Sequence, residues 1–371
     1  MTAFDSLIAS VRPVSADLAA EAQRRLDSLT KPRGSLGRIE SLARSIVCVA
    51  GRMDYSVRRK VIFTFAADHG ITEEGVSLYP RTVTAQMVEN FVAGGAAVNV
   101  LARKAGAEVC VIDAGTLVPA ASSGSCLIQP MSETSALGAS ETLIRKRIGA
   151  GTRNFLVENA MSRADAVRAV EWGADVFEES HAKAPIDLAG VGDMGIGNSS
   201  SAAAVLCCLL GVPPSSVVGR GTGLDDAGLN RKIDVIDRAL KARSAIVSDP
   251  IDVLSKVGGF EIGEMAGCFI AGAARRTPMV VDGFISTAAA ALASRMCPAV
   301  RDYLFFSHRS AEGGHALVLQ KLGVDPILDF HMRLGEGTGA ALAMQILDSA
   351  VGIFQEMATF QSAGVDDVGR G

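Results

Sequence analysis

The sequence predicts an α/β fold in which helices cover both faces of a six-stranded, mainly parallel, doubly wound sheet. Short apolar runs rich in β-branched residues recur along the chain, and each ends at a glycine or a polar residue. The runs are nearly continuous rather than alternating, as in parallel strands that are buried on both faces. Segments with helical spacing separate them, and this alternation is typical of βαβ units.

The expected elements follow in chain order. Strands are expected at 61–68, 108–115, 186–193, 278–285, 303–310 and 326–334. Helices are expected at 82–105, 162–182, 199–211, 260–275, 286–297, 311–322 and 338–357. Because ligands of such sheets bind outside the carboxyl ends of the strands, the strand-to-helix turns are where we expect chemistry.

The start of the chain differs from the rest. Residues 15–29 and 37–52 have the spacing of two amphipathic helices but no strand to pair with. We therefore expect a smaller helical domain made of 1–58 plus 338–371, beside an α/β domain at 59–337.

Composition and charge exclude several classes of protein. The 371 residues are 49% hydrophobic and 20% charged, which is enough apolar material for a sizeable core. The net charge of −4 gives no reason to expect nucleic acid or an anionic membrane as a partner. Asp282 interrupts the best candidate for a membrane span, 277–294, and no apolar run reaches the roughly 20 residues that a span needs.

The seven cysteines are scattered, and their odd number argues against a disulfide framework. They are Cys48, Cys110, Cys126, Cys207, Cys208, Cys268 and Cys297. The first residues lack the basic and apolar regions of a signal peptide. We expect reduced core thiols in a cytoplasmic protein.

A glycine-rich turn follows the predicted strand at 186–193. Gly190, Gly192, Gly195 and Gly197 allow a ligand to approach the backbone, and the next helix presents free N–H groups and a positive dipole end. This combination favours phosphate, and the alternative is tight packing of helix on sheet without a ligand. The G-x-G-x-x-G spacing lacks the acidic residue expected about 20 positions later, which argues against NAD.

A second glycine-rich turn, 219–226, precedes a helix that contains Lys232. A lysine near such a turn can meet a phosphate as a point charge, although a solvated helix lysine is the commoner case. The sequence contains no G-x-x-x-x-G-K-[ST] motif, so a P-loop nucleotidase is not indicated.

Glu336 lies between two glycines where the last predicted strand leads into a helix. A carboxylate at this place can act as a general base if apolar surroundings raise its pKa towards neutrality. The alternative is an acid that only complements the helix dipole.

Other polar residues carry weaker signals. The five histidines form neither an H-E-x-x-H motif nor a Cys/His cluster, so no metal is expected. Asp68 and His69 end the first predicted strand, where a functional pair and a structural hydrogen bond both fit. No G-x-S-x-G elbow surrounds Ser310, which can still donate to a phosphate.

The segment 76–91 combines a turn at Pro80 with a helix that places Thr82, Gln86 and Met87 near one face. Apolar groups beside one amide suit a flat heteroaromatic ligand, whereas a Met-bearing helix face is most often core. The sequence leaves both interpretations open.

Seven ordered motifs, from about residue 15 to 357, resemble those of the nicotinate-nucleotide–dimethylbenzimidazole phosphoribosyltransferase family. They are KPRGSLGRIE (31–40), FAADHGITEEGVSLYP (65–80), VTAQMVENFVAGGAAVNVLAR (83–103), GVGDMGIGNSSSAA (190–203), VDGFIST (281–287), SHRSAEGGH (307–315) and LGEGTGAALA (334–343). The resemblance implies a homodimer with a Rossmann-like domain and a small domain of helices from both chain ends. It also implies transfer of phosphoribose from nicotinate mononucleotide to 5,6-dimethylbenzimidazole, which makes the lower-ligand nucleotide of cobalamin.

The resemblance implies roles for individual residues as well. The general base of the family falls on Glu336 and a family lysine on Lys232. A second carboxylate falls on Asp193, where well-known members have glutamate, one methylene longer. Phosphate and ribose contacts fall on Gly195, Gly221, Thr222, Gly223, Gly283 and Ser310. The benzimidazole pocket falls on Leu78, Thr82, Gln86, Met87 and Leu334.

The residues and the resemblance agree on a mechanism without a cofactor. Bound phosphate orients the sugar, and Glu336 accepts the proton of the benzimidazole. Asp193 stabilises an oxocarbenium-like transition state as nicotinate leaves and the anomeric centre inverts. Two other functions remain open on the sequence alone: a sensor that binds the base without turnover, and an NAD-dependent dehydrogenase, against which the missing acid argues.

Overall fold

The computed structural model describes residues 2–117 and 142–366 and confirms the α/β prediction. One sheet holds six strands, and every neighbouring pair is parallel. The strands are β1 (Lys60–Ala67), β2 (Ala107–Gly115), β3 (Thr142–Arg145), β4 (Leu188–Met194), β5 (Met279–Val281) and β6 (Leu304–Phe306). Their spatial order, β3-β2-β1-β4-β5-β6, reverses direction between β1 and β4, which is the order of doubly wound sheets.

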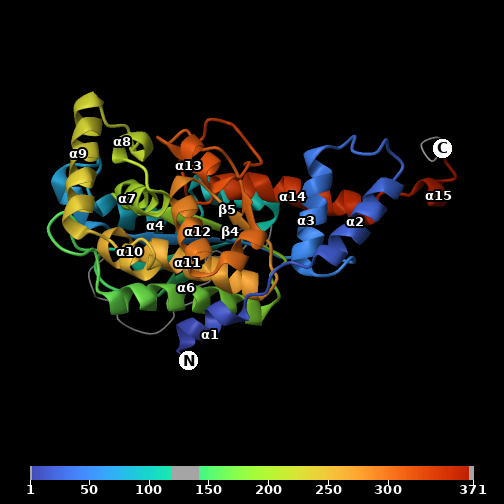
Figure 1. The fold of residues 1–371 in the computed structure, drawn as a ribbon, viewed down its shortest axis with the longest axis horizontal. Helices are drawn as coiled ribbons and strands as arrows, with labels where there is room; N and C mark the ends of the chain where they lie inside the picture. Colours follow the sequence, from blue (N-terminus) through green and yellow to red (C-terminus); the bar gives the residue numbers. More distant parts are fainter. Residues whose placement is uncertain (1, 118–141, 367–371) are drawn as a thin grey trace.

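Helices cover both faces of this sheet (Figure 1). They are α1 (Ala3–Ser10), α2 (Ala16–Ser28), α3 (Arg38–Ala50), α4 (Thr82–Val92), α5 (Ala97–Ala105), α6 (Arg163–Lys183), α7 (Asn198–Leu210), α8 (Pro214–Val217), α9 (Asp226–Arg243), α10 (Pro250–Val257), α11 (Phe260–Ala274), α12 (Phe284–Met296), α13 (His315–Leu322), α14 (Thr338–Glu356) and α15 (Phe360–Ala363). Contacts place α11 and α12 on one face, with α6 outside α11, and place α5 and α14 on the other. The result is a three-layer arrangement whose core lies on both sides of the sheet.

Two differences from the sequence prediction concern strands. The segment 326–334 is not a strand: an isolated bridge joins Leu328 to His308, two residues beyond the end of β6. The φ of His331 is 54°, which breaks an extended conformation, and Phe330 is 63% exposed rather than buried. The sixth strand is β3 instead, which the sequence analysis did not predict because the strand has only four residues, of which Leu143 and Ile144 alone are apolar.

A third difference concerns the helix expected at 82–105. It forms two helices, α4 and α5, because Gly94 interrupts it with a φ of 74°. A Cβ on the next residue, Gly95, would stand 2.5 Å from the Asn90 side chain. The turn between the helices therefore requires small residues at both positions.

The helices from the two chain ends lie together at one end of the molecule (Figure 1). Helices α2 and α3 and the C-terminal half of α14 share a small separate core. Its buried side chains are Ala22, Leu26, Leu29, Ala43, Val47, Ala350 and Phe354. Helix α1 instead contacts α6 and α11 of the large body. The division into domains at 1–58 plus 338–371 and at 59–337 stays a prediction.

The described cysteines are free thiols, and all of them except Cys208 are buried. Cys126 lies outside the described residues. In the described part of the chain, no helix combines the length and the apolar character that a membrane crossing requires.

Candidate active site

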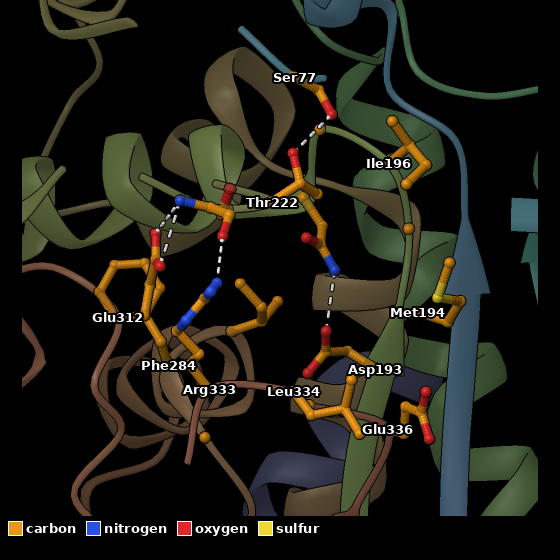
Figure 2. A pocket seen from close by; sticks show the side chains of 18 of the residues that line it. Ser77, Asp193, Met194, Ile196, Thr222, Phe284, Glu312, Arg333, Leu334 and Glu336 are labelled. Atoms are coloured by element: carbon orange, nitrogen blue, oxygen red, sulfur yellow. Dashed lines mark hydrogen bonds between the residues drawn. The ribbon is translucent and has the colours of Figure 1, made fainter. Parts of the chain in front are cut away.

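A cavity of about 320 Å³ lies at the carboxyl end of β4, next to the point where the strand order reverses (Figure 2). The turns after three strands supply much of its wall: 193–199 after β4, 283–285 after β5 and 308–312 after β6. Residues 333–336, just before α14, Gly221 and Thr222, and parts of 76–87 complete it. The cavity therefore occupies the place where open α/β sheets bind ligands.

The glycines of the first glycine-rich turn have two different tasks. Gly192 lies within β4, and a Cβ there would stand 2.2 Å from the backbone nitrogen of Gly337. Gly190 meets the same helix, and its Cβ position is 3.0 Å from the nearest side chain. Tight packing of α14 on the sheet thus accounts for these two glycines. Gly195 and Gly197 also pack closely, since their Cβ positions are 2.3 Å from the Ala67 carbonyl oxygen and 2.7 Å from the Thr72 side chain, and both also line the cavity.

Glu336 directly precedes α14 in a backbone conformation that side chains rarely adopt. Its φ is 66°, between Gly335 at 85° and Gly337 at 102°. This left-handed geometry costs a non-glycine residue about 1–2 kcal/mol. Thr64 Oγ1 donates to the Glu336 carbonyl at 2.7 Å, and the Glu336 N–H donates to the Asp193 carbonyl at 3.1 Å. These buried hydrogen bonds impose the conformation that puts the carboxylate on the cavity wall.

The Glu336 carboxylate is nearly buried, since only 5% of the residue is exposed, yet it lines the cavity. Burial raises the pKa of Glu336 to about 6, the Val98 N–H at 3.4 Å from Oε2 opposes the rise, and the charge of Asp282 adds to it. A carboxylate with this pKa is mostly ionised at pH 7 and still basic enough to take a proton. The electrostatics favour a general base, because a dipole-complementing acid would have a lowered pKa.

Asp193 occupies the end of β4 and also lines the cavity. Asn198 Nδ2 donates to its Oδ2 at 2.8 Å, whereas the buried Oδ1 has no hydrogen-bond partner among the described residues. Burial raises the pKa of Asp193 well above its usual range, and the charges of Asp282 and Glu261 raise it further. A bound cation would lower this pKa again, so the site is suited to a positive charge.

Asp282 ties the helix after Glu336 to the sheet. Its carboxylate accepts the N–H of Gly337 at 3.0 Å and the N–H of Ala340 at 2.9 Å, at the start of α14. Burial raises the pKa of Asp282 to about 7, although these N–H groups oppose the rise. The side chain follows β5 directly, so it fixes Glu336 relative to the strands that carry the rest of the wall.

The second glycine-rich turn lines part of the cavity and is bonded to a buried lysine. Lys232 Nζ donates to Ser199 Oγ at 2.8 Å and to the Gly219 carbonyl at 3.2 Å. Burial lowers the pKa of Lys232 to about 8, and the charge of Glu312 opposes the shift. Ser199 and Gly221 line the cavity, whereas Lys232 does not. The lysine therefore contributes to this wall indirectly, by holding Ser199 and the glycine-rich turn in place.

Apolar side chains form much of the remaining wall. They are Val76, Val83, Met87, Met194, Ile196, Phe284, Ile285 and Leu334. Such a surface, beside a few polar groups, is typical of sites that bind a flat heteroaromatic molecule.

Comparison with known proteins assigns the family. A family model described as phosphoribosyltransferase (DBI_PRT) matches residues 11–365. Proteins of Geobacter metallireducens and Desulforudis audaxviator named nicotinate-nucleotide–dimethylbenzimidazole phosphoribosyltransferase are 47% and 49% identical to this chain. The matches cover 99% and 96% of both chains. The chain belongs to the nicotinate-nucleotide–dimethylbenzimidazole phosphoribosyltransferase family.

The fold of the family matches as well. The crystal structure of CobT from Thermus thermophilus superposes with a TM-score of 0.86 at 41% identity, over 96% of this chain and 100% of that one. The resemblance of the seven motifs is thereby confirmed along nearly the whole chain.

The structure brings together nine of the residues to which the family resemblance assigns roles. Those that line the cavity are Met87, Asp193, Gly195, Gly221, Thr222, Gly283, Ser310, Leu334 and Glu336. Those that do not line it are Leu78, Thr82, Gln86, Gly223 and Lys232. Leu78 and Gly223 lie next to Thr222, since the Leu78 N–H donates to Thr222 Oγ1 at 3.2 Å. The ligand contacts of all these residues stay predictions.

The rotation of α4 explains two of the residues outside the cavity. Thr82 and Gln86 are exposed, whereas Val83 and Met87, each one position later, line the cavity. The helix itself is as predicted, but Thr82 and Gln86 lie about 100° around its axis from the residues that line the cavity.

Several lining residues were missed by the sequence analysis. They are Ser77, Tyr79, Asn198, Ser199, His308, Glu312 and Arg333. Six of them lie in the seven family motifs: Ser77 and Tyr79 in FAADHGITEEGVSLYP, Asn198 and Ser199 in GVGDMGIGNSSSAA, and His308 and Glu312 in SHRSAEGGH. Arg333 lies in the segment 326–334, which was predicted as a strand but forms a loop.

Asp68 and His69 lie outside this cavity. His69 is fully buried, with its Nδ1 2.9 Å from Ser201 Oγ and its Nε2 2.9 Å from Glu261. Thr84 Oγ1 donates to Asp68 at 2.7 Å. The structural alternative therefore describes this pair. Within residues 2–117 and 142–366, no group of His, Cys, Asp and Glu is arranged to hold a metal ion.

Proposed function

We propose that this protein transfers the phosphoribosyl group of nicotinate mononucleotide to 5,6-dimethylbenzimidazole. The bond from C1 of ribose to nicotinate breaks, and a bond from C1 to a benzimidazole nitrogen forms. The proton of the other benzimidazole nitrogen goes to Glu336. The products are nicotinate and α-ribazole 5′-phosphate, with inversion at C1. The observation that supports this proposal most is the nearly buried Glu336 carboxylate, with a pKa of about 6, on the cavity wall.

The two kinds of cavity wall support the proposed positions of the substrates. Small polar groups at Gly195, Gly221, Thr222 and Ser310 suit the phosphate, with Lys232 behind them. The apolar side chains around Met87 and Leu334 suit the benzimidazole. Binding of the unreactive phosphate then orients C1 for attack, which is how remote contacts accelerate a reaction.

Charge supports the proposed role of Asp193. The ring of nicotinate mononucleotide is a pyridinium cation, and the sugar carbon becomes more positive as the bond to the ring breaks. A positive charge beside Asp193 lowers the pKa of its buried carboxyl and favours the ionised form. Because the cationic leaving group is already activated, the proposed reaction needs no metal.

We also propose that the protein is a cytoplasmic homodimer. Tyr79 and Leu334 line the cavity although they are 54% and 58% exposed, and a second subunit would cover this apolar surface. The free thiols of the described cysteines support a reducing compartment. Sedimentation velocity tests the assembly, and a monomer at every concentration would contradict it.

The reaction itself is tested by chromatography. The protein is incubated with nicotinate mononucleotide and dimethylbenzimidazole in the presence of a chelator, and nicotinate and a ribazole phosphate should appear in equal amounts. If the folded protein binds the base but yields neither product, the proposal is wrong and a non-catalytic sensor becomes the better interpretation.

A further inference from the structure

The carboxylate of Glu312 is a polar feature of the cavity that the proposed mechanism does not use. Glu312 lies in the turn after β6, is 7% exposed and lines the cavity. Its Oε1 and Oε2 accept the same N–H, that of Gly221, at 2.9 and 3.2 Å. Figure 2 shows it across the cavity from Glu336, beneath the second glycine-rich turn.

The Glu312 carboxylate can accept more hydrogen bonds than the described residues donate to it. A carboxylate can accept about four hydrogen bonds, and among the described residues only the Gly221 N–H donates to it. Lys232 contributes a favourable charge, but its Nζ donates to Ser199 and Gly219 instead. A nearly buried charge with free acceptor sites is costly unless a ligand supplies donors.

The main chain around Glu312 holds the carboxylate in place. Ser310 Oγ accepts the Glu312 N–H at 3.1 Å, and the His315 N–H donates to the Glu312 carbonyl at 3.2 Å. A Cβ on Gly219 would stand 2.5 Å from Glu312 Oε1, so the turn fits closely around the carboxylate. The side chain is therefore a preorganised acceptor rather than a mobile surface acid.

The chemistry of the proposed substrates limits what can meet this acceptor. Phosphate and the nicotinate carboxylate are themselves anionic acceptors and would repel Glu312. The pyridinium ring offers a charge but no N–H or O–H. The single N–H of the benzimidazole is already assigned to Glu336. Only the two neighbouring hydroxyls of the ribose offer a pair of donors to one carboxylate.

We propose that Glu312 recognises the ribose hydroxyls of the donor and makes the enzyme selective for ribonucleotides over deoxyribonucleotides. This inference rests on the proposed function. In the proposed arrangement the ribose joins the phosphate, placed near Gly221, to the base, placed near Glu336, so the sugar lies along the wall that carries Glu312. Loss of a hydroxyl leaves the nearly buried carboxylate with the Gly221 N–H and one donor fewer from the ligand, and an unpaired buried polar group is the strongest basis for rejecting an analogue.

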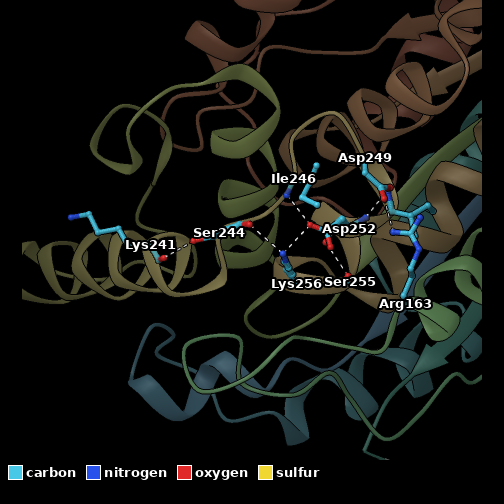
Figure 3. A network of polar contacts seen from close by, with 9 residues as sticks. Arg163, Lys241, Ser244, Ile246, Asp249, Asp252, Ser255 and Lys256 are labelled. Atoms are coloured by element: carbon cyan, nitrogen blue, oxygen red, sulfur yellow. Dashed lines mark hydrogen bonds and ion pairs between the residues drawn. The ribbon is translucent and has the colours of Figure 1, made fainter.

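A purely structural role of Glu312 predicts a different result. If the carboxylate only holds the glycine-rich turn, its replacement weakens ribose and deoxyribose donors alike. A matched control is Asp252, which also holds a loop, since it accepts the Ile246 N–H at 2.7 Å and pairs with Lys256 at 3.0 Å (Figure 3). Asp252 does not line the cavity, so Asp252→Asn removes a loop-holding charge without touching the sugar site.

The experiment compares three enzymes on three donors. Wild type, Glu312→Gln and Asp252→Asn are assayed with nicotinate mononucleotide and with its 2′-deoxy and 3′-deoxy analogues, and kcat/KM is measured for each. The preference of an enzyme is its kcat/KM for the ribose donor divided by that for an analogue. Differences in intrinsic reactivity between sugars cancel when two enzymes are compared on the same pair of donors.

We expect Glu312→Gln to lower the preference about 10- to 100-fold for at least one analogue, the range of a hydrogen bond to a charged group. Asp252→Asn should leave it within about twofold of wild type. Glu312→Ala, with its folding checked by circular dichroism, should repeat the loss. An unchanged preference in both Glu312 variants, with ribose and deoxyribose donors weakened alike, overturns the inference. Absence of any wild-type turnover instead overturns the proposed function and the inference with it.

Discussion

Replacement of the proposed base by Glu336→Gln should separate catalysis from stability. Glutamine keeps the size of the side chain and the strained backbone conformation, but it cannot accept a proton. General-base catalysis typically contributes about 10²- to 10⁴-fold, so kcat should fall by that factor. The KM for nicotinate mononucleotide should change little, because the proton transfer concerns the benzimidazole.

The same substitution should stabilise the fold above pH 6. Burial raises the pKa of Glu336 from its ordinary 4.5 to about 6, so the folded state holds the proton more tightly than the unfolded state. Ionisation therefore destabilises the protein: the penalty is absent below pH 4.5, grows between pH 4.5 and 6, and is complete above pH 6. The shift corresponds to about 2 kcal/mol, and access of water from the cavity reduces this to about 1 kcal/mol.

Two assays check this prediction. Initial rates between pH 5 and 8 should show a wild-type kcat that falls on the acid side with an apparent pKa near the value of about 6 for Glu336. Urea unfolding at pH 8 and at pH 4 should show a gain for Glu336→Gln at pH 8 only. A variant with wild-type kcat, or one destabilised equally at both pH values, would refute the reasoning.

Three further substitutions test the rest of the site. Gly192→Ala would place a methyl group 2.2 Å from the Gly337 nitrogen, so it should lower the free energy of unfolding in urea by about 3 kcal/mol and also lower kcat. The control is Gly352→Ala, whose methyl group would have no neighbour nearer than 4.0 Å and which should be neutral or stabilising. Equal effects of the two alanines would contradict the packing argument. Lys232→Met removes the N–H donors behind the turn at which we propose the phosphate binds. It should raise the KM for nicotinate mononucleotide roughly tenfold in initial-rate assays, and an unchanged KM would exclude a role of Lys232 in phosphate binding. Asp193→Asn removes the carboxylate that we propose faces the reacting sugar, and it should lower kcat about 10- to 100-fold in a steady-state assay at saturating substrate. An unchanged kcat would mean that the residue only packs.

Much of the sheet was predictable because its strands are continuous apolar runs. The run that begins at Val61 lies within one residue of β1, and the run that begins at Glu108 lies within one residue of β2. The failure at 326–334 has a physical cause. Two of its apolar residues, Phe330 and Leu334, are exposed, and the backbone at His331 adopts a positive φ that the sequence pattern does not predict.

The candidate site was predictable where it depends on strand ends and glycines. Glu336 was predicted because it sits at a junction between a strand-like segment, glycines and a helix, whereas the role of Asp193 came from the family resemblance, and both line the cavity. Glu312 and Arg333 were not found, because they reach the cavity from turns whose path depends on tertiary contacts such as the bond from Arg333 to the Gly221 carbonyl. Periodicity describes helices and strands, and it carries no information on such loops.

Helix α14 runs from the candidate site to the small core of α2 and α3. The helix starts next to Glu336, and its last turns lie in the small core with α2 and α3. Nineteen residues of α-helix form a rod of about 28 Å. Contacts with β4, β5 and α5 hold the helix along its side, and Asp282 accepts two N–H groups at its start. One continuous helix therefore joins the turn of Glu336 to the small core of α2 and α3, so the N-terminal helices pack on the same element that positions the carboxylate.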